Sequence, residues 1–366
     1  MHHVDYSFLQ ALWFILIAVL WIGFFVLEGF DFGVGMLMRT VGRSEGERRA
    51  ILHTIGPMWD GNEVWLLTAG GATFAAFPLW YATLFSGFYL ALFLVLVALI
   101  VRGVSFEFWG KSDNPRWRSV WEWAMVVSCT LAALLFGVAW ANIVRGVPIN
   151  AAQNFTGSLW TLLNPYALLG GVTLVLLMLA HGANFLTMRT EGAMMDRARG
   201  VARWASPVAA AALVAFLVWT VADISDPSAA EIAVATLAGL IAVALGTVGV
   251  RELSRRSAVS FVLSTLAIVT LFTTLFVDLF PTVMPSSTRP AWDLTIANTS
   301  SSHMTLLLMA IVAAVMVPIV LAYTSWVYWV FRKRVSAEQF DLQTKNPIDL
   351  VRGVRAPGDA GAPSAP

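Results

Sequence analysis

Long apolar runs, separated by short polar connections, make up most of this chain. Nine of them are long enough to cross about 30 Å of hydrocarbon, which takes about 20 residues each. The predicted spans are residues 8–38, 51–77, 79–101, 119–144, 159–188, 204–222, 232–250, 259–281 and 303–331. The alternation of polar and apolar residues that is typical of membrane strands is absent, so we expect an all-α integral membrane protein. The second and third spans require a tight hairpin at Pro78.

Composition supports a membrane protein. The chain has 366 residues, of which 58% are hydrophobic and 12% charged, whereas a soluble domain carries about 25% charged residues. A net charge of +1 with scattered basic residues argues against a nucleic-acid partner. We expect residues 1–335 to form one polytopic membrane domain. Residues 336–366 are expected to be a cytoplasmic tail, partly disordered, because its end is rich in Pro, Gly and Ala.

The basic residues predict the orientation of the spans. All of the 23 Lys and Arg residues except Arg145 and Arg289 fall in alternate connections or in the C-terminal tail. Basic residues collect on the cytoplasmic side of membrane proteins. We therefore expect the N-terminus outside and the C-terminus in the cytoplasm of a cell membrane. One span more or fewer would scramble this asymmetry, so it also supports a number near nine.

Four carboxylates interrupt the first two spans. Glu28 and Asp31 are spaced i, i+3 in the first, and Asp60 and Glu63 in the second, so each pair shares a helix face. If the second span starts at residue 51, Asp60 lies roughly 14 Å from its cytoplasmic end at 1.5 Å per residue. Charged side chains in the hydrocarbon region are costly and commonly functional. The pattern predicts an acidic cluster that opens to the cytoplasm.

Further residues extend this cluster. Arg102 and Glu107 lie at the cytoplasmic end of the third span and could complete a charge network. One hypothesis is that these carboxylates take up protons or anchor a polar headgroup. Burial and mutual repulsion would then influence the protonation of each carboxylate. The alternative is an ion-pair network that fixes helix packing. Trp59 and Trp65 flank the acids and are candidates for contact with a quinone or a partner.

Histidine and cysteine placement predicts no metal site. The five histidines are His2, His3, His53, His181 and His303. No two are expected at matched depth on facing helices, as a bis-histidine haem requires. The single cysteine, Cys129, and the absence of CxxC, CxxCH and HExxH patterns point the same way. We expect no metal and no directly bound cofactor in this chain, with a single ligand from a His or from one of the 13 Met residues as the alternative.

Short motifs follow one another through most of the chain, and the block at 28–78 is the most specific. They are EGFDFGVG (28–35), ERR (47–49), TIGPMWDGNEVWLLTAGGATFAAFP (54–78), FSGFYLAL (85–92), LNPYALLGG (163–171), MRTEG (188–192), VMPSST (283–288) and SSxxTL (301–306). Together they resemble subunit II of cytochrome bd-type quinol oxidases. Glu28 stands where that family often has Asp, which keeps the charge, and His181 stands where Gln can occur.

The resemblance implies a haem-free subunit of a bacterial respiratory terminal oxidase. Its partner would be a homologous subunit I with two b haems and one haem d. The complex would oxidise quinol and reduce dioxygen to water, electrogenically but without pumping protons. The resemblance also implies two four-helix bundles plus a peripheral helix. It places Asp60 on the cytoplasmic proton route, with Asp31 in the same neighbourhood. A structural quinone and small accessory subunits occur in some members.

Two rival functions follow from the residues alone. A proton-coupled transporter would explain buried acids, but no pair of interrupted helices in corresponding halves marks a midplane substrate site. A scaffold would keep the fold and the partner and treat the acids as structural. A transporter predicts activity without a haem-bearing partner, whereas an oxidase subunit predicts none.

Overall fold

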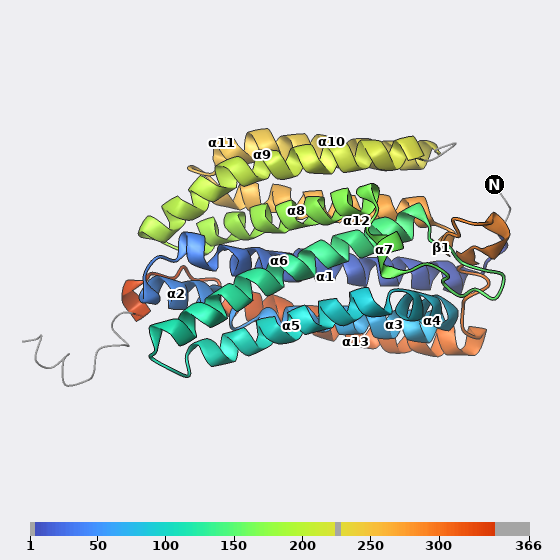
Figure 1. Ribbon diagram of the computed structural model, residues 1–366, viewed down its shortest axis with the longest axis horizontal. Helices are drawn as coiled ribbons and strands as arrows, with labels where there is room; N and C mark the ends of the chain where they lie inside the picture. Colours follow the sequence, from blue (N-terminus) through green and yellow to red (C-terminus); the bar gives the residue numbers. More distant parts are fainter. Residues whose placement is uncertain (1–3, 224–227, 341–366) are drawn as a thin grey trace, which may run out of the picture.

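The chain folds into helices that run side by side along one axis (Figure 1). The computed structural model describes residues 4–223 and 228–340. His2, His3 and the predicted tail beyond Phe340 lie outside the described residues. The helices are α1 Phe8–Val41, α2 Glu45–Ile55, α3 Trp59–Ala76, α4 Pro78–Gly87, α5 Tyr89–Trp109, α6 Pro115–Arg145, α7 Leu159–Leu162, α8 Pro165–Arg189, α9 Gly192–Asp223, α10 Ala229–Ala244, α11 Val250–Glu252, α12 Ser257–Leu279 and α13 His303–Val330.

Small irregular elements complete the described part of the chain. A π-helical stretch, Leu245–Gly249, joins α10 to α11. Strands β1 Thr282–Met284 and β2 Leu294–Thr295 pair antiparallel, and a 3-10 turn, Pro290–Trp292, lies between them. The expectation of an all-helical chain therefore misses one short strand pair, which lies in the connection between α12 and α13.

Eight helical stretches in the described residues are long and apolar enough to cross a membrane. They are α1, α5, α6, α8, α9, the continuous stretch Ala229–Glu252, α12 and α13. Helix α3 has 18 residues, about 27 Å at 1.5 Å per residue. Asp60, Asn62 and Glu63 near its start make it too polar to be recognised as a span by composition. The chain is thus a multi-pass membrane protein, and the ninth span stays a prediction.

Helix starts follow local sequence signals. Ser7 and Ser44 cap α1 and α2 through capping boxes with Gln10 and Glu47, which satisfy backbone N–H groups that have no partner in the helix. Helices α6 and α8 begin with Asn-Pro, at Asn114 and Asn164. There the Asn side chain accepts from the first turn, and the following Pro has no N–H to leave unpaired.

The predicted second and third spans are wrong in detail. Helix α2 ends at Ile55, and Gly56 and Pro57 form a turn before α3 begins, because proline cannot donate the hydrogen bond that would continue the helix. Asp60 is consequently the second residue of α3, not a residue nine positions into a continuous helix. Pro78 does not form a hairpin. It is the first residue of α4, a ten-residue helix that separates α3 from α5.

Packing divides the long helices into two groups. In the first, α1 contacts α3 and α6, and α5 contacts α6; in the second, α8, α9, α10 and α12 contact one another. Helices α1 and α6 also pack against α8 and so join the groups. Helix α13 lies along α1 and α3. Only 6% of the residues in its most apolar stretch are buried inside the chain. It is therefore peripheral.

The basic connections gather at one end of the molecule. Figure 1 shows α2, α11 and the α5–α6 and α8–α9 connections at this end, with α4, α7, β1 and the N-terminus at the other. We call the first the basic end. It carries the connections and helix termini to which the positive-inside rule assigns the cytoplasm.

Candidate functional site

A buried charge cluster lies where α1, α3 and α5 meet. The Arg102 guanidinium forms an ion pair with Glu28, and its Nη1 lies 3.7 Å from Glu63 Oε2. Glu28, Asp31 and Arg102 are fully buried. Three of the four predicted acids and the predicted cation are thus brought together by three helices, and Glu28 and Arg102 lie 74 positions apart in the sequence.

Aromatic rings enclose the Arg102 side chain. The guanidinium carbon lies 5.1 Å from the Phe32 ring centroid, 5.6 Å from Trp59 and 5.7 Å from Phe106. Trp59 and Phe106 stack with centroids 4.8 Å apart. Ring faces attract a cation, and the attraction strengthens where water is excluded. The aromatic enclosure therefore helps to hold a positive charge inside the apolar part of the molecule.

Asp31 is held by hydrogen bonds that the sequence analysis did not predict. Asn62 Nδ2 donates to Asp31 Oδ2 at 2.7 Å, and the Tyr328 hydroxyl donates to Asn62 Oδ1 at 2.8 Å. Asn62 is 2% exposed. A polar amide between two acids in an otherwise apolar run was a usable signal for Asn62. The sequence holds no comparable signal for Tyr328, because Tyr328 lies 266 positions away from Asn62.

Several buried atoms of the cluster lack a hydrogen-bond partner among the described residues. They are Glu28 Oε2, Asp31 Oδ1, Arg102 Nε and Arg102 Nη2. Buried polar atoms in folded proteins are nearly always paired with protein groups or with water, so these atoms are positions where water or another polar group can bind. The cluster thus has donors and acceptors beyond those its internal bonds use.

The remaining predicted residues lie at the edge of the cluster or outside it. Asp60 is exposed on the surface of this chain and interacts electrostatically with Glu63, which in turn interacts with Arg102. Glu107 is also exposed and forms no ion pair among the described residues, so the expected closure of the network by Glu107 is wrong. Trp59 forms a wall of the cluster, whereas Trp65 packs against Gly23 of α1.

A second ionic network ties helices together at the basic end. Glu122 of α6 is 1% exposed and accepts from Arg39 and Arg48, and it also accepts from Trp109 Nε1. Nearby, Arg197 of α9 pairs with Glu47 of α2. Burial by itself would raise the Glu47 pKa, but hydrogen bonds from Arg197 and from backbone N–H groups hold this pKa below its ordinary value. These contacts fix α2 against α6 and α9.

The three histidines in the described part of the chain lie on three different helices, α2, α8 and α13. His181 is fully buried, with Nδ1 2.7 Å from Ser264 Oγ and Nε2 3.1 Å from Val26 O, so both ring nitrogens are engaged. His53 and His303 lie on α2 and at the start of α13, at opposite ends of the molecule. In the part of the chain that the structure describes, no three His, Cys, Asp or Glu residues gather as a metal site would need.

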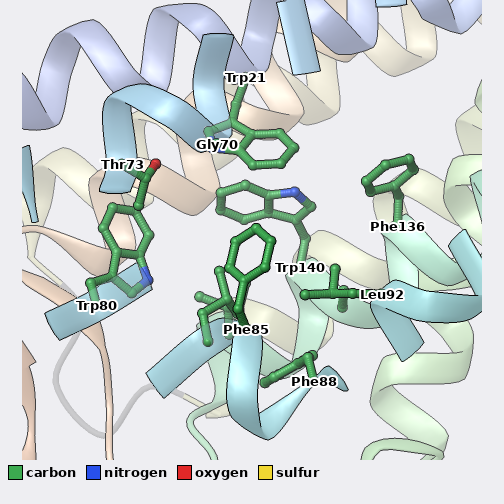
Figure 2. A pocket seen from close by; sticks show the side chains of 12 residues that line it. Trp21, Gly70, Thr73, Trp80, Phe85, Phe88, Leu92, Phe136 and Trp140 are labelled. Carbon is green, nitrogen blue, oxygen red and sulfur yellow. The ribbon is translucent and has the colours of Figure 1, made fainter. Parts of the chain in front are cut away.

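An aromatic cavity lies nearer the end opposite the basic end. Figure 2 shows Trp21, Trp80, Phe85, Phe136 and Trp140 around it. The cavity encloses about 30 Å³, far below the roughly 300–1,000 Å³ of ligand pockets. A quinone ring does not fit it without rearrangement of these side chains.

Comparisons with known proteins agree over nearly the whole chain. The family described as cytochrome bd terminal oxidase subunit II matches residues 9–331. The cytochrome bd ubiquinol oxidase subunit 2 of Bacillus subtilis is 43% identical over 331 residues, covering 90% of this chain and 98% of that protein. The cytochrome bd-I ubiquinol oxidase subunit 2 of Escherichia coli K12 is 38% identical over 374 residues, covering 93% and 99%.

A solved structure shares the fold. A chain of the bd oxidase from Geobacillus thermodenitrificans superimposes with a TM-score of 0.70 at 15% identity, covering 88% of this chain and 99% of that one. The family assignment rests on the sequence matches, and the resemblance found in the short motifs is confirmed. This chain belongs to the cytochrome bd terminal oxidase subunit II family and is a subunit of a bacterial respiratory oxidoreductase complex in the cell membrane.

Proposed function

We propose that this chain pairs with a haem-bearing subunit I in a complex that oxidises quinol and reduces dioxygen to water. The relatives are named as second subunits of quinol oxidases, which supports a partner and a quinol substrate. Haems in the partner would supply the electron transfer and oxygen chemistry. In the described part of the chain, His181 uses both ring nitrogens in hydrogen bonds, and His53 and His303 lie on other helices. We assign to this chain the binding of the partner and the handling of protons.

We further propose that the charge cluster forms part of the proton-uptake path from the cytoplasm. Dioxygen reduction consumes protons that must enter the membrane. Asp60 is exposed in the first turn of α3, and Glu63 is one turn further along the same helix. Glu63 in turn approaches Arg102, which pairs with Glu28. This order leads from the surface of the chain to fully buried carboxylates at Glu28 and Asp31.

The exposure of Asp60 also supports partner contact along α3. A carboxylate on a membrane-embedded surface is costly against lipid and is tolerated against protein or water. Exposed apolar side chains continue along the same helix at Val64, Leu67 and Phe74. A subunit that covers α3 would enclose Asp60 and extend the acid series across the interface. Quinone contact by Trp59 or Trp65, a structural quinone and accessory subunits stay predictions.

The observation that carries the proton hypothesis is the series of carboxylates that runs from the exposed Asp60 through Glu63 to the fully buried Glu28 and Asp31. The buried carboxylate and guanidinium atoms without a protein partner lie at the inner end of this series. In a purely structural ion-pair network, every buried donor and acceptor is expected to have a hydrogen-bond partner, because each unpaired buried group costs free energy. A relay needs free donor and acceptor positions. The rival scaffold function predicts that acid variants damage assembly rather than turnover.

Replacing Asp60 with Asn tests the proposal directly. Asp60→Asn keeps the side-chain shape and removes the titratable proton. We expect the complex to assemble with normal haem content and to lose most quinol oxidase turnover, while Asp60→Glu retains part of it. The measurement is haem-normalised oxygen consumption.

The matched control is Asp196→Asn. Asp196 is exposed on α9 at the basic end and pairs only with Arg199 among the described residues. It should leave turnover unchanged. If Asp60→Asn consumes oxygen like wild type, Asp60 is not on the proton path; if it fails to assemble but the surviving complex turns over normally, Asp60 is structural.

A further inference from the structure

We infer that Tyr328 and Asn62 are positioning residues for the carboxylate of Asp31, so that the peripheral helix α13 takes part in proton handling. The inference rests on the proposed proton role of the cluster and adds residues to it. Its basis is one continuous series of hydrogen bonds, from the Tyr328 hydroxyl to Asn62 and from Asn62 to Asp31. It links α13, α3 and α1.

The orientation of the Asn62 amide is the central step. An amide has a donating end and an accepting end. Tyr328 donates to Oδ1, which leaves the NH₂ group to donate to Asp31 Oδ2 and, at 3.4 Å, toward Leu27 O. If the amide were reversed, its oxygen would face a carboxylate oxygen. The Tyr328 hydroxyl therefore favours the orientation in which Asp31 receives a donor.

Tyr328 is itself fixed in place. It lies two residues before the end of α13, and its ring packs edge-on against Phe30 of α1 at 6.3 Å. Immediately beyond the helix, Arg189 of α8 donates to Phe331 O. The Val335 N–H donates to Arg189 O at 2.8 Å. Val335 and Thr190 form an isolated parallel β-bridge. The basic end of α13 is thus anchored, although most of the helix is exposed.

Other charged groups also act on Asp31, so its partners must be separated experimentally. Arg102 and Glu63 interact with it electrostatically, and so does Glu28 on its own helix. Tyr328 and Asn62 differ from these in being uncharged. Replacing Tyr328 by Phe removes one hydrogen bond, and replacing Asn62 by Leu removes those to Asp31, Leu27 and Tyr328. Neither change alters the number of charges in the cluster.

Tyr328→Phe in the assembled oxidase tests the inference, with Tyr323→Phe as the matched control. Tyr323 is on the same helix, 63% exposed, and outside the hydrogen-bond series. We expect Tyr328→Phe to lower kcat about tenfold, the effect of one net hydrogen bond in the transition state. Haem content and the quinol KM should be unchanged, and Tyr323→Phe should match wild type.

Infrared difference spectroscopy provides a second measurement, the frequency of the Asp31 carboxyl band. A change in helix packing alone should not shift this frequency. The carboxyl band that disappears in Asp31→Asn belongs to Asp31. We expect this band to shift in frequency in Tyr328→Phe and in Asn62→Leu, and to stay in place in Tyr323→Phe. An unshifted band in Tyr328→Phe overturns the inference. The spectrum can be recorded on whatever fraction of the complex assembles.

A double-mutant cycle distinguishes this inference from the function on which it rests. If Tyr328 acts through Asn62, combining Tyr328→Phe with Asn62→Leu lowers kcat no further than Asn62→Leu alone. Additive losses overturn the inference. If Asp31→Asn turns over normally, the proton role of Asp31 is wrong, and the band shift alone decides whether Tyr328 positions this carboxyl.

Discussion

At the scale of single residues, the Glu28–Arg102 pair determines what the cluster tolerates. Both side chains are fully buried, and each is stabilised by the charge of the other. The rings around Arg102 stabilise the guanidinium alone. Removing two charges from water is expensive, and a buried pair stabilises little beyond that cost. Removing one partner is much worse, because it leaves a buried charge uncompensated.

This asymmetry predicts the order of stability in a variant series. Arg102→Met should destabilise the complex by about 3–5 kcal/mol, seen as a lower midpoint of thermal unfolding and a lower yield of assembled complex. The double variant Glu28→Leu with Arg102→Met removes both charges and should recover much of that loss without recovering turnover. A double variant no more stable than Arg102→Met would show that Glu28 is not the main partner of Arg102.

The charged members of the cluster and the neighbouring Trp59 could be predicted from the sequence, whereas Asn62 and Tyr328 were missed. Glu28, Asp31, Glu63 and Arg102 could be predicted because a charge inside an apolar run stands out. Tyr328 could not, because a tyrosine near the end of a membrane helix is ordinary and its partner lies far away in sequence. The sequence likewise does not show that Glu107 is exposed and forms no ion pair among the described residues.

At the scale of helices, close approach of α1 to α8 holds the two helix groups together. A Cβ added at Gly182 would meet the backbone of Gly33 and Val34, and one added at Gly33 would meet the backbone of α8. Small residues at such crossings let backbones pack closely. The contact lies next to the charge cluster on α1, so it also sets the position of Asp31.

Gly182→Ala should therefore destabilise the complex by about 1–3 kcal/mol, the usual cost of overpacking. Gly200→Ala is the matched control, because Gly200 is exposed in α9 with no other group within 4 Å of an added Cβ. It should be neutral or slightly stabilising, since alanine favours helix. Thermal unfolding of the purified complex measures both. Equal midpoints for the two variants would contradict the role of the α1–α8 contact.

The long apolar helices were predictable to within a few residues at most ends, but the region from 45 to 89 was not. Apolar runs predict where a helix can be buried in lipid. They do not show where the chain turns within a run. Gly56 and Pro57 end α2 inside what reads as one span, and Pro78 begins a short extra helix. Both prolines act through local backbone chemistry, which the hydrophobic pattern does not report.

At the scale of the whole molecule, the direction of the proposed proton uptake depends on which end faces the cytoplasm. The basic end carries α2, α11 and the connections rich in arginine (Figure 1). Asp60 and Glu63 begin α3 at this end, and Asp31 and Tyr328 lie toward it on their own helices. If the basic end is cytoplasmic, the proposed path through the charge cluster starts from the cytosol.

Accessibility of single cysteines tests this orientation. Lys111 lies in the α5–α6 connection at the basic end, and Ser287 lies between β1 and β2 at the other; both are exposed. The one native cysteine, Cys129, is fully buried and should not react. We expect Lys111→Cys to react with a membrane-impermeant thiol reagent only in inverted vesicles, and Ser287→Cys only in right-side-out cells. Wild-type protein provides the background in both preparations. The reverse labelling pattern would place the basic end outside, and the cluster could then not take up protons from the cytoplasm.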